Sequence, residues 1–472
     1  MQFPVRGTTV AGALFATAAS AFALLIPASD PDLFWHLASG DWMLDHRELL
    51  TLDVFSFTRS GVGYRTGQWL GEVVLALVFR AGGWLGLELL RASLVGVAAF
   101  FASRATMRVQ PHVGWAAIPV IATILVSRTI WADRPQLFTL ALFPFVFDLL
   151  IAARLEGKGR RLALLPFLFL AWANLHGAFV AGLALVAVFV VEALLARPHE
   201  LRGAMTLAFV GSALASFGNP DGPRALFAGL GYASTSGAYI VEEGPLDVIG
   251  GAGVVVAGLF LGSLAIAFVL GYEGIAARLS SPLLWAGLIV PFGLLGFAIQ
   301  RQVTLACIVI APFVAAGLPA VLGRRQVTAL LVPRLGSCLF LTTCGIVLAV
   351  EAAALAPRAP DLTGYPVGAV DVLARTQGNV LNEYDWGGFL IRMAPAHPVF
   401  VDGRGAALYV PDVLGDFDEA VRLRPGYRAV LDRWRVDLVL VRPARPLAVA
   451  LRDGGWRVLG EEIDKWVLLR RP

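Results

Sequence analysis

Long apolar runs separated by short polar segments dominate the chain up to about residue 356. A helix needs roughly 20 mostly apolar residues to cross a bilayer, and runs near this length recur from Val10 to about Ala356. The pattern predicts about eleven transmembrane helices. These lie near residues 9–28, 84–103, 113–131, 135–153, 162–174, 178–196, 203–217, 251–270, 282–299, 303–322 and 334–356.

The residues after Ala356 have a different pattern. Short runs of β-branched and aromatic residues alternate there with a more helical stretch at 413–434. The short runs lie at 379–384, 398–402, 436–441 and 456–469. We therefore expect a transmembrane domain over residues 1–356, with a long first outer loop at 29–70, and a soluble domain over residues 357–472. The expected fold class is an α-helical polytopic membrane protein with a small C-terminal α/β domain.

Composition agrees with this organisation and excludes several classes of protein. The chain of 472 residues is 57% hydrophobic and 15% charged, with a mean hydropathy of +0.72, which is too apolar for a soluble globular protein. The formal net charge of +4 forms no basic stripe with exposed aromatic residues, so we expect no nucleic-acid partner. Cys307, Cys338 and Cys344 fall in apolar stretches, where we expect buried structural thiols.

The distribution of Lys and Arg predicts the orientation in the membrane. If the N-terminus is cytoplasmic, alternate gaps between the spans carry the basic residues, as the positive-inside rule requires. These residues are Arg6, Arg104, Arg108, Lys158, Arg160, Arg161, Arg197, Arg202, Arg278, Arg324 and Arg325. The other gaps and the C-terminal domain are then extracytoplasmic. We expect a multi-pass protein of the cell (inner) membrane whose first span is an uncleaved signal anchor.

An unusual polar segment follows the first span and begins Asp30-Pro31-Asp32. Asp30 suits a helix N-cap, Pro31 the first helical position, and Asp32 the positive end of the helix dipole, so both acids have a structural explanation. His36 lies one turn after Asp32 on the same helix face. A carboxylate beside an imidazole can accept or orient a proton, which a cap does not require. Apolar neighbours such as Trp35 predict an amphipathic helix at the membrane interface.

Other unusual polar residues are predicted at the outer ends of the membrane helices. Arg128, Arg134 and Arg301 could each bind a phosphate bidentately, or could simply reach lipid headgroups. Asn174 and His176 interrupt an apolar run, and they either line a substrate cavity or form a tight turn.

The sequence has no motif for nucleotide or serine chemistry. It contains no zincin-type metal spacing, no P-loop and no G-x-S-x-G motif. A divalent metal ion held by Asp30 and Asp32 stays open. Glu242 and Glu243 in a long outer loop are either additional acids near the site or a solvated acidic loop.

Several of these motifs, taken in order along the chain, resemble a known family. They are Asp30-Pro31-Asp32, Trp35-His36, Asp53-Val54-Phe55-Ser56-Phe57-Thr58, Arg134-Pro135-Gln136, Asn174-Leu175-His176-Gly177, Tyr384-Asp385-Trp386-Gly387-Gly388 and Asp402-Gly403-Arg404. The ordered set resembles bacterial membrane proteins of the GT-C glycosyltransferase superfamily. The resemblance covers most of the chain, from Asp30 to Arg404.

The resemblance implies a glycosyltransferase of the cell envelope. Such an enzyme transfers a sugar from a polyprenyl-phosphate donor to a glycan, lipid or protein acceptor on the outer face, usually with inversion. The catalytic acid of the first loop corresponds here to Asp32, with Asp30 as the alternative, and we expect His36 to assist. Gln68-Trp69-Leu70 stands where many members have Glu-Trp-Leu, so we place Gln68 and Trp69 among the substrate-binding residues.

The residue types fit this chemistry by themselves. An attacking hydroxyl needs a base, and a departing lipid phosphate needs positive charge or hydrogen-bond donors. We therefore expect Arg134, Arg301 and Arg128 to engage the donor phosphate, and Asn174 and His176 to line the substrate site.

Three questions stay open at this point. The C-terminal motifs at 384–388 and 402–404 either form an acceptor-binding surface or are turns and strand ends with an Asp-Arg pair. A transporter or flippase of lipid-linked saccharides would use the same polar residues to line a path, although the chain has no inverted repeat. A non-catalytic scaffold subunit would use the C-terminal domain to recruit partners.

Overall fold

The computed structural model describes residues 5–195, 201–227, 244–323, 345–346, 348–354, 356 and 359–472. Contacts divide the chain into two compact units. Unit 1 contains residues 1–27, 88–229 and 241–357, and unit 2 contains residues 28–87, 230–240 and 358–472. Cys338 and Cys344, Glu242 and Glu243, and most of the expected span at 334–356 lie outside the described residues.

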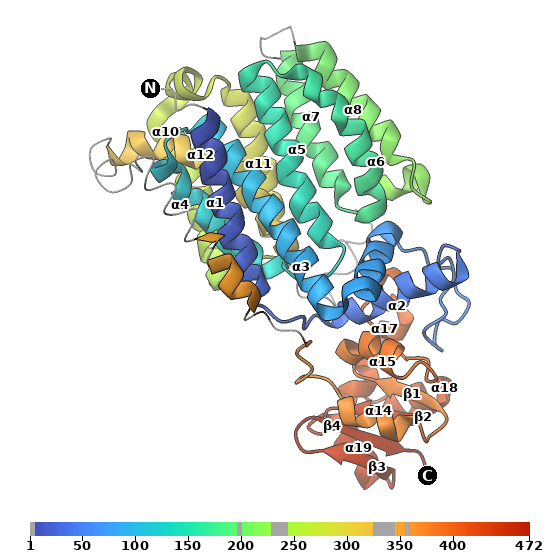
Figure 1. Cartoon of the computed structure of the whole chain (residues 1–472). Coiled ribbons are helices and arrows are strands. Elements are labelled where there is room, and N and C mark those ends of the chain that lie inside the picture. The colour runs from blue at the N-terminus through green and yellow to red at the C-terminus, as the bar shows by residue number, and fades with distance from the viewer. Residues whose placement is uncertain are drawn as a thin grey trace. The chain divides into compact units, whose positions relative to one another are not determined.

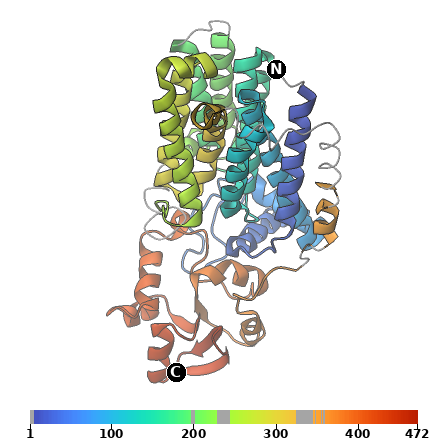
Figure 2. The same cartoon turned by 90° about the vertical axis from the view of Figure 1, so that its left-hand side faces the viewer.

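Unit 1 is a bundle of helices that lie side by side in Figures 1 and 2. Its helices are α1 (Val5–Leu24), the C-terminal part of α3 (Trp69–Val109), α4 (Val113–Ser127), α5 (Gln136–Glu156), α6 (Leu165–Leu175), α7 (Phe179–Leu195), α8 (Arg202–Ser216), α10 (Gly251–Leu279), α11 (Pro282–Ala298) and α12 (Val303–Leu322). Short 3-10 turns include η1 (Arg128–Ile130), η2 (Gly159–Leu164) and η6 (Gln300–Gln302).

Five helices of the described chain are long and apolar enough to cross a membrane. They cover Trp69–Val109, Val113–Ile130, Gln136–Glu156, Gly251–Leu279 and Gln300–Leu322. The apolar helices α7 and α11 fall at expected spans but are shorter. The protein is therefore a membrane protein built mostly of helices, as the hydropathy pattern predicted, and the number of eleven spans stays a prediction.

Two helices form the centre of unit 1. The residues of α12 from Val303 to Ala315 are all buried, and most residues of α5 from Gln136 to Ala153 are buried too. A helix that is apolar and buried on every side belongs in the interior of a bundle. Contacts with α4, α5, α10 and α11 surround α12. Cys307 lies in this helix and is buried, as expected for a structural thiol.

Unit 2 combines the first outer loop with the C-terminal residues. It contains α2 (Pro31–His46), the start of α3, α14 (Val367–Leu373), β1 (Asn379–Asn382), α15 (Gly387–Met393), α16 (Ala406–Tyr409), α17 (Asp412–Val421), α18 (Tyr427–Arg433), β2 (Val436–Val441), α19 (Pro446–Asp453), β3 (Arg457–Glu462) and β4 (Trp466–Arg470). The sheet order is β1-β2-β4-β3, with β1 parallel to β2 and the other pairs antiparallel. The expected small C-terminal sheet with its helices is confirmed, and residues 28–87 belong to the same compact unit.

The sheet of unit 2 is covered on both faces. Alternate residues of its central strands belong to different core clusters, with Leu438 and Leu440 in one and Val439 and Val441 in the other. This explains why β2 is apolar almost throughout rather than alternating. The run at 398–402, which the sequence pattern gave as a strand, makes only isolated bridges from Val399.

Helix α2 is part of this core. Phe34 and Trp35 are buried in the same cluster as Phe389 of α15, and the rings of Phe34 and Phe389 are 5.5 Å apart. The packing therefore differs from the expected amphipathic helix at the membrane interface. The apolar face that such a helix would offer to lipid is covered by protein.

Candidate active site

The first turn of α2 holds the two acids singled out in the sequence. Asp30 has extended backbone geometry and is the N-cap, and its Oδ1 atom accepts a hydrogen bond from the Asp32 amide at 2.9 Å. Pro31 occupies the first helical position, where its missing N–H costs no hydrogen bond. Asp32 is half-buried, and its Oδ1 atom accepts a hydrogen bond from Trp35 Nε1 at 3.0 Å. Capping thus occupies one oxygen of Asp30, whereas the Asp32 carboxylate accepts its hydrogen bond from Trp35.

His36 is paired with an acid that the sequence analysis did not select. Its Nδ1 atom lies 3.1 Å from Oε1 of Glu72 in the first turn of α3, and both side chains are buried. Thr66 Oγ1 donates to the same Oε1 atom at 2.9 Å. An oxygen that already accepts one hydrogen bond favours a proton on His36 Nδ1, which leaves Nε2 as the basic nitrogen. The His36 ring also packs on Trp35, with ring centroids 3.6 Å apart.

A buried ion cluster joins the first loop to the C-terminal residues. Arg404 donates from Nη2 and Nε to Asp402 at 2.7 and 2.8 Å, and from Nη1 to Asp53 at 2.5 Å. Tyr409 and Asp402 also hydrogen bond, at 2.6 Å. Burial opposes the charge of Arg404, but Asp402, Tyr409 and Asp53 outweigh it and raise the pKa of Arg404 well above its ordinary value. The Asp402-Gly403-Arg404 motif therefore forms a charged, buried ion-pair network with the first loop within unit 2.

Unit 1 contains a separate cluster of predicted site residues. Arg134 lies just before α5, and Arg301 lies in η6 just before α12, so each precedes one of the two central helices. His176 follows α6, and burial together with the charges of Arg301 and Arg134 lowers the pKa of His176 to about 3. The imidazole is therefore neutral near pH 7. Helix N-termini and guanidinium groups both favour an anion, so this cluster has the electrostatics of an anion site.

The hydrogen bonds of His176 fix which of its nitrogens carries the proton. Trp172 Nε1 donates to Thr139 Oγ1 at 2.8 Å, so the Thr139 hydroxyl is free to donate to His176 Nδ1, 2.9 Å away. The Ala178 amide also points to Nδ1, at 3.3 Å. With Nδ1 acting as an acceptor, the proton is on Nε2, and a neutral His176 is a hydrogen-bond donor.

The other predicted substrate residues of unit 1 have different surroundings. Arg128 is exposed, its guanidinium lies 5.4 Å from the centre of the Phe22 ring, and it lines an open groove of about 410 Å³ with apolar residues of α4 and α10. Asn174 is buried and donates to the backbone oxygens of Leu170 and Gly218. Asn174 thus ties the end of α6 to the end of α8.

Gln68 and Trp69 mark the start of α3 in unit 2. The Gln68 carbonyl accepts a hydrogen bond from the Glu72 amide at 3.1 Å, and the Trp69 side chain packs at the edge of a core cluster. Glu72 therefore stands one helical turn after Gln68, the position at which the sequence lacks the expected acid. The signal that could have revealed it is the i to i+4 spacing from Gln68 along a predicted helix.

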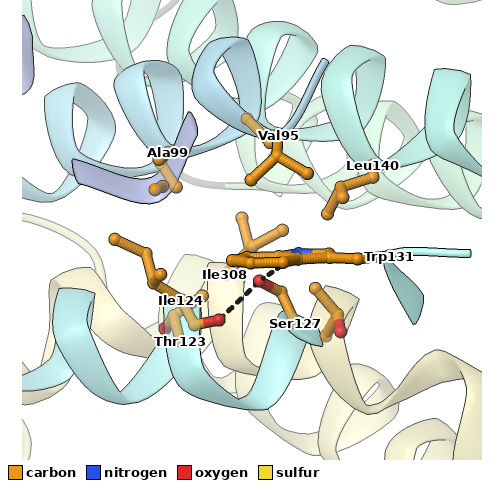
Figure 3. A pocket seen from close by; sticks show the side chains of 12 residues that line it. Val95, Ala99, Thr123, Ile124, Ser127, Trp131, Leu140 and Ile308 are labelled. Atoms are coloured by element: carbon orange, nitrogen blue, oxygen red, sulfur yellow. Dashed lines mark hydrogen bonds between the residues drawn. The ribbon is translucent and has the colours of Figure 1, made fainter. Parts of the chain in front are cut away.

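A small internal cavity lies between α3, α4, α5 and α12 (Figure 3). Its volume of about 20 Å³ suffices for a single water molecule but not for a sugar. The indole of Trp131 lies along it and donates to Ser127 Oγ at 3.0 Å. The cavity therefore belongs to the packing of the bundle.

The structure thus separates the predicted site residues into two groups. Asp30, Asp32 and His36 share the first turns of α2 in unit 2, while Arg134, Arg301 and His176 form the cationic cluster of unit 1. Among the described residues, no three His, Cys, Asp or Glu side chains are grouped so that they could hold a metal ion.

Comparison with known proteins finds similarity in structure only. No family model and no curated protein sequence matches the chain. The oligosaccharyltransferase AglB of Archaeoglobus fulgidus, solved with an inhibitory peptide and a dolichol-phosphate, superimposes with a TM-score of 0.63 at 11% identity, over 92% of this chain and 69% of that one.

Two further structures of the Archaeoglobus fulgidus oligosaccharyltransferase cover the same shares of the two chains, 92% and 69%. The form tethered to an acceptor peptide gives a TM-score of 0.55 at 12% identity, and the apo form gives 0.54 at 11% identity. At such identities the likeness concerns the fold. The chain therefore has the fold of the archaeal oligosaccharyltransferase over 92% of its length.

Proposed function

We propose that the protein is a membrane glycosyltransferase that transfers a sugar from a polyprenyl-phosphate donor to an acceptor on the extracytoplasmic face. The observation that carries this proposal is the oligosaccharyltransferase fold over 92% of the chain. That neighbour was solved with a dolichol-phosphate and an inhibitory peptide, and another with an acceptor peptide. A lipid-linked donor and a separate acceptor are accordingly the partners that we propose here.

In the proposed reaction Asp32 is the general base. The acceptor hydroxyl attacks the anomeric carbon as Asp32 removes its proton, a new C–O bond forms, and the bond from the anomeric carbon to the phosphate oxygen breaks. The sugar is transferred with inversion because the attack and the departure occur on opposite faces. His36, oriented by Glu72, assists Asp32 from within the protein. It does not contact the substrate, since it is only 2% exposed.

Within unit 1, we assign the cationic cluster as a binding site for the phosphate of a polyprenyl-phosphate lipid. Arg134 and Arg301 can each donate two hydrogen bonds to phosphate oxygens, and the neutral His176 can donate one more from Nε2. Asn174 contributes indirectly, because its hydrogen bonds hold the end of α6 just before His176.

The test is chemical analysis of cells that lack the gene and carry either the wild-type protein or Asp32→Asn. We expect mass spectrometry of glycans and glycolipids to show a glycosylated product only with the wild type, and unused polyprenyl-phosphate sugar with Asp32→Asn. Loss of a positioned base costs about 10²- to 10⁴-fold in rate. Asp45→Asn is the matched control, because Asp45 lies on the same helix with a side chain 62% exposed.

Three results would contradict the proposal. Asp32→Asn could restore the product in full, which would show that Asp32 is not the base. Alternatively, deletion could leave every glycan and glycolipid intact, or could change only the side of the membrane on which a lipid-linked saccharide lies. The last result would indicate a flippase, since transport breaks no glycosidic bond.

A further inference from the structure

Two glycines of the C-terminal residues lie directly against the first turn of α2. A Cβ atom added to Gly403 would lie 1.7 Å from Asp32 Oδ1 and 2.8 Å from Trp35 Nε1. A Cβ atom added to Gly388 would lie 2.6 Å from the Pro31 carbonyl oxygen. Separations this short do not occur between non-bonded atoms, so a side chain at Gly403 would displace the Asp32 carboxylate, and one at Gly388 would displace the backbone at Pro31.

The requirement at these positions is for space and not for an unusual backbone. Neither Gly388 nor Gly403 has a positive φ, unlike Gly405 at +49° or Gly378 at +127°. Gly387 and Gly388 even begin a helix, α15, where glycine is unfavourable because it loses more conformational freedom than other residues. Close approach of α2 compensates for this local disadvantage.

The contacts around Asp32 leave its carboxylate little freedom. Trp35 Nε1 donates to Oδ1 at 3.0 Å, and the indole is itself only 4% exposed and packs on the His36 ring. Asp30 holds the backbone amide of Asp32. Gly403 lies against the same Oδ1 atom. The rotamer of Asp32 is therefore determined from α2 on one side and from the C-terminal residues on the other.

Buried contacts hold the backbone on both sides of Gly403. Its neighbours Asp402 and Arg404 belong to the buried ion cluster with Asp53. A Cβ atom on Gly387 would lie 2.2 Å from the Val401 carbonyl oxygen, so the motif at 384–388 is packed directly against the motif at 402–404. The two motifs form one surface, which we call the glycine cradle and define as Gly387, Gly388 and Gly403.

We propose that Gly388 and Gly403 are positioning residues, which hold the Asp32 carboxylate in its reactive orientation by letting the C-terminal residues close onto α2. This inference rests on the proposed function, because it assumes that Asp32 acts as the base. It also answers the open question about the two C-terminal motifs: they act on the acid of the first loop and need not contact the acceptor.

Kinetics of the full-length protein in native membrane vesicles, which supply the acceptor, test the proposal. The probes are undecaprenyl-phosphate glucose, mannose and arabinose radiolabelled in the sugar, and the measurement is the initial rate at which the label passes from the lipid donor to the acceptor. For Gly403→Ala we expect kcat to fall about 30- to 100-fold while KM for the donor changes less than about threefold, because a misplacement near 1 Å can cost 10²-fold in rate. Gly388→Ala should have the same signature with a smaller loss. Gly415→Ala is the control, since no atom lies within 4 Å of its added Cβ.

A second variant reaches Asp32 without introducing a clash. Trp35→Phe removes the Nε1 donor and should lower kcat about tenfold with little change in KM. If both substitutions act by displacing Asp32, the double variant Trp35→Phe/Gly403→Ala should lose much less than the product of the two single losses. Wild-type kcat in Trp35→Phe, or fully multiplicative losses, would overturn the proposal.

Hydrogen exchange supplies a readout that does not depend on activity. Amides of residues 30–37 should exchange faster in Gly403→Ala than in the wild type, while those of β2 and β4 should be unchanged. Unchanged exchange at residues 30–37, or faster exchange throughout the sheet, would overturn the proposal that Gly388 and Gly403 position Asp32. A wild-type protein that consumes none of the three donors would count against the proposed function, whereas the exchange comparison would still decide the cradle.

Discussion

The acidic group of unit 2 and the cationic group of unit 1 are organised in opposite ways. In unit 2, several polar residues contact groups far away in the sequence: His36 pairs with Glu72, Asp53 with Arg404, and Asp32 lies against Gly403. In unit 1, Arg134 and Arg301 occupy the positions just before central helices, where the hydropathy pattern itself places them. The comparison indicates that contacts between distant segments fix the acidic residues of unit 2. The cationic residues of unit 1 are instead fixed by their positions at helix ends.

We therefore expect that replacing a charged residue has a different effect in each unit. Removing a member of the buried cluster should damage folding, because it leaves an uncompensated buried charge. Removing a cation at a helix end should damage binding, because both arginines of unit 1 keep partial contact with solvent.

The largest expected effect is that of Arg404→Met. The change leaves Asp53 and Asp402 buried without their cation, which we expect to cost about 3–5 kcal/mol of stability. Thermal unfolding in detergent, followed by tryptophan fluorescence, should show a lowered transition for unit 2. Arg428→Met is the control because Arg428 is exposed on α18 and pairs only with its neighbour Tyr427 in the interactions found for it. Equal melting of the two variants would contradict the structural role of the cluster.

A smaller effect, of a different kind, is expected from Arg301→Gln. Loss of a charge-assisted hydrogen bond to phosphate costs about 1.5–3 kcal/mol, which corresponds to a KM for the donor raised roughly 10- to 100-fold, with melting unchanged. Steady-state kinetics with a radiolabelled polyprenyl-phosphate sugar measure this. Arg278→Gln, at the end of α10, provides the comparison within the same unit. A lowered kcat at constant KM would move Arg301 out of donor binding.

The smallest effect should come from Glu72→Gln. The amide oxygen can still accept a hydrogen bond from His36 Nδ1, but an NH2 group replaces the second carboxyl oxygen, so we expect the orientation of His36 to be disturbed and kcat to fall about tenfold. Glu48→Gln, which alters an exposed acid beyond the end of α2, should leave kcat unchanged. A wild-type kcat in Glu72→Gln would reduce Glu72 to a packing role.

Much of unit 1 could be predicted from the sequence. Continuous apolar runs need a membrane or a bundle interior, so the described helices α4, α5, α10 and α12 fall where hydropathy placed them. Asp30 as a cap was equally accessible, since a cap depends on residues two or three positions apart. The covering of α2 by α15 was not accessible, because the apolar face of a helix does not say whether lipid or protein covers it.

The sequence by itself determined which segments are helices in an apolar environment, which segment carries the acids, and where cations end the central helices. Each of these follows from local periodicity, capping and hydropathy. Only the tertiary structure decided that Glu72 meets His36, that Arg404 meets Asp53, and that Gly403 lies against Asp32. These pairs are separated by 36, 351 and several hundred residues, and no local rule relates such positions. They are brought together by the packing of unit 2, which buries apolar residues from distant parts of the chain.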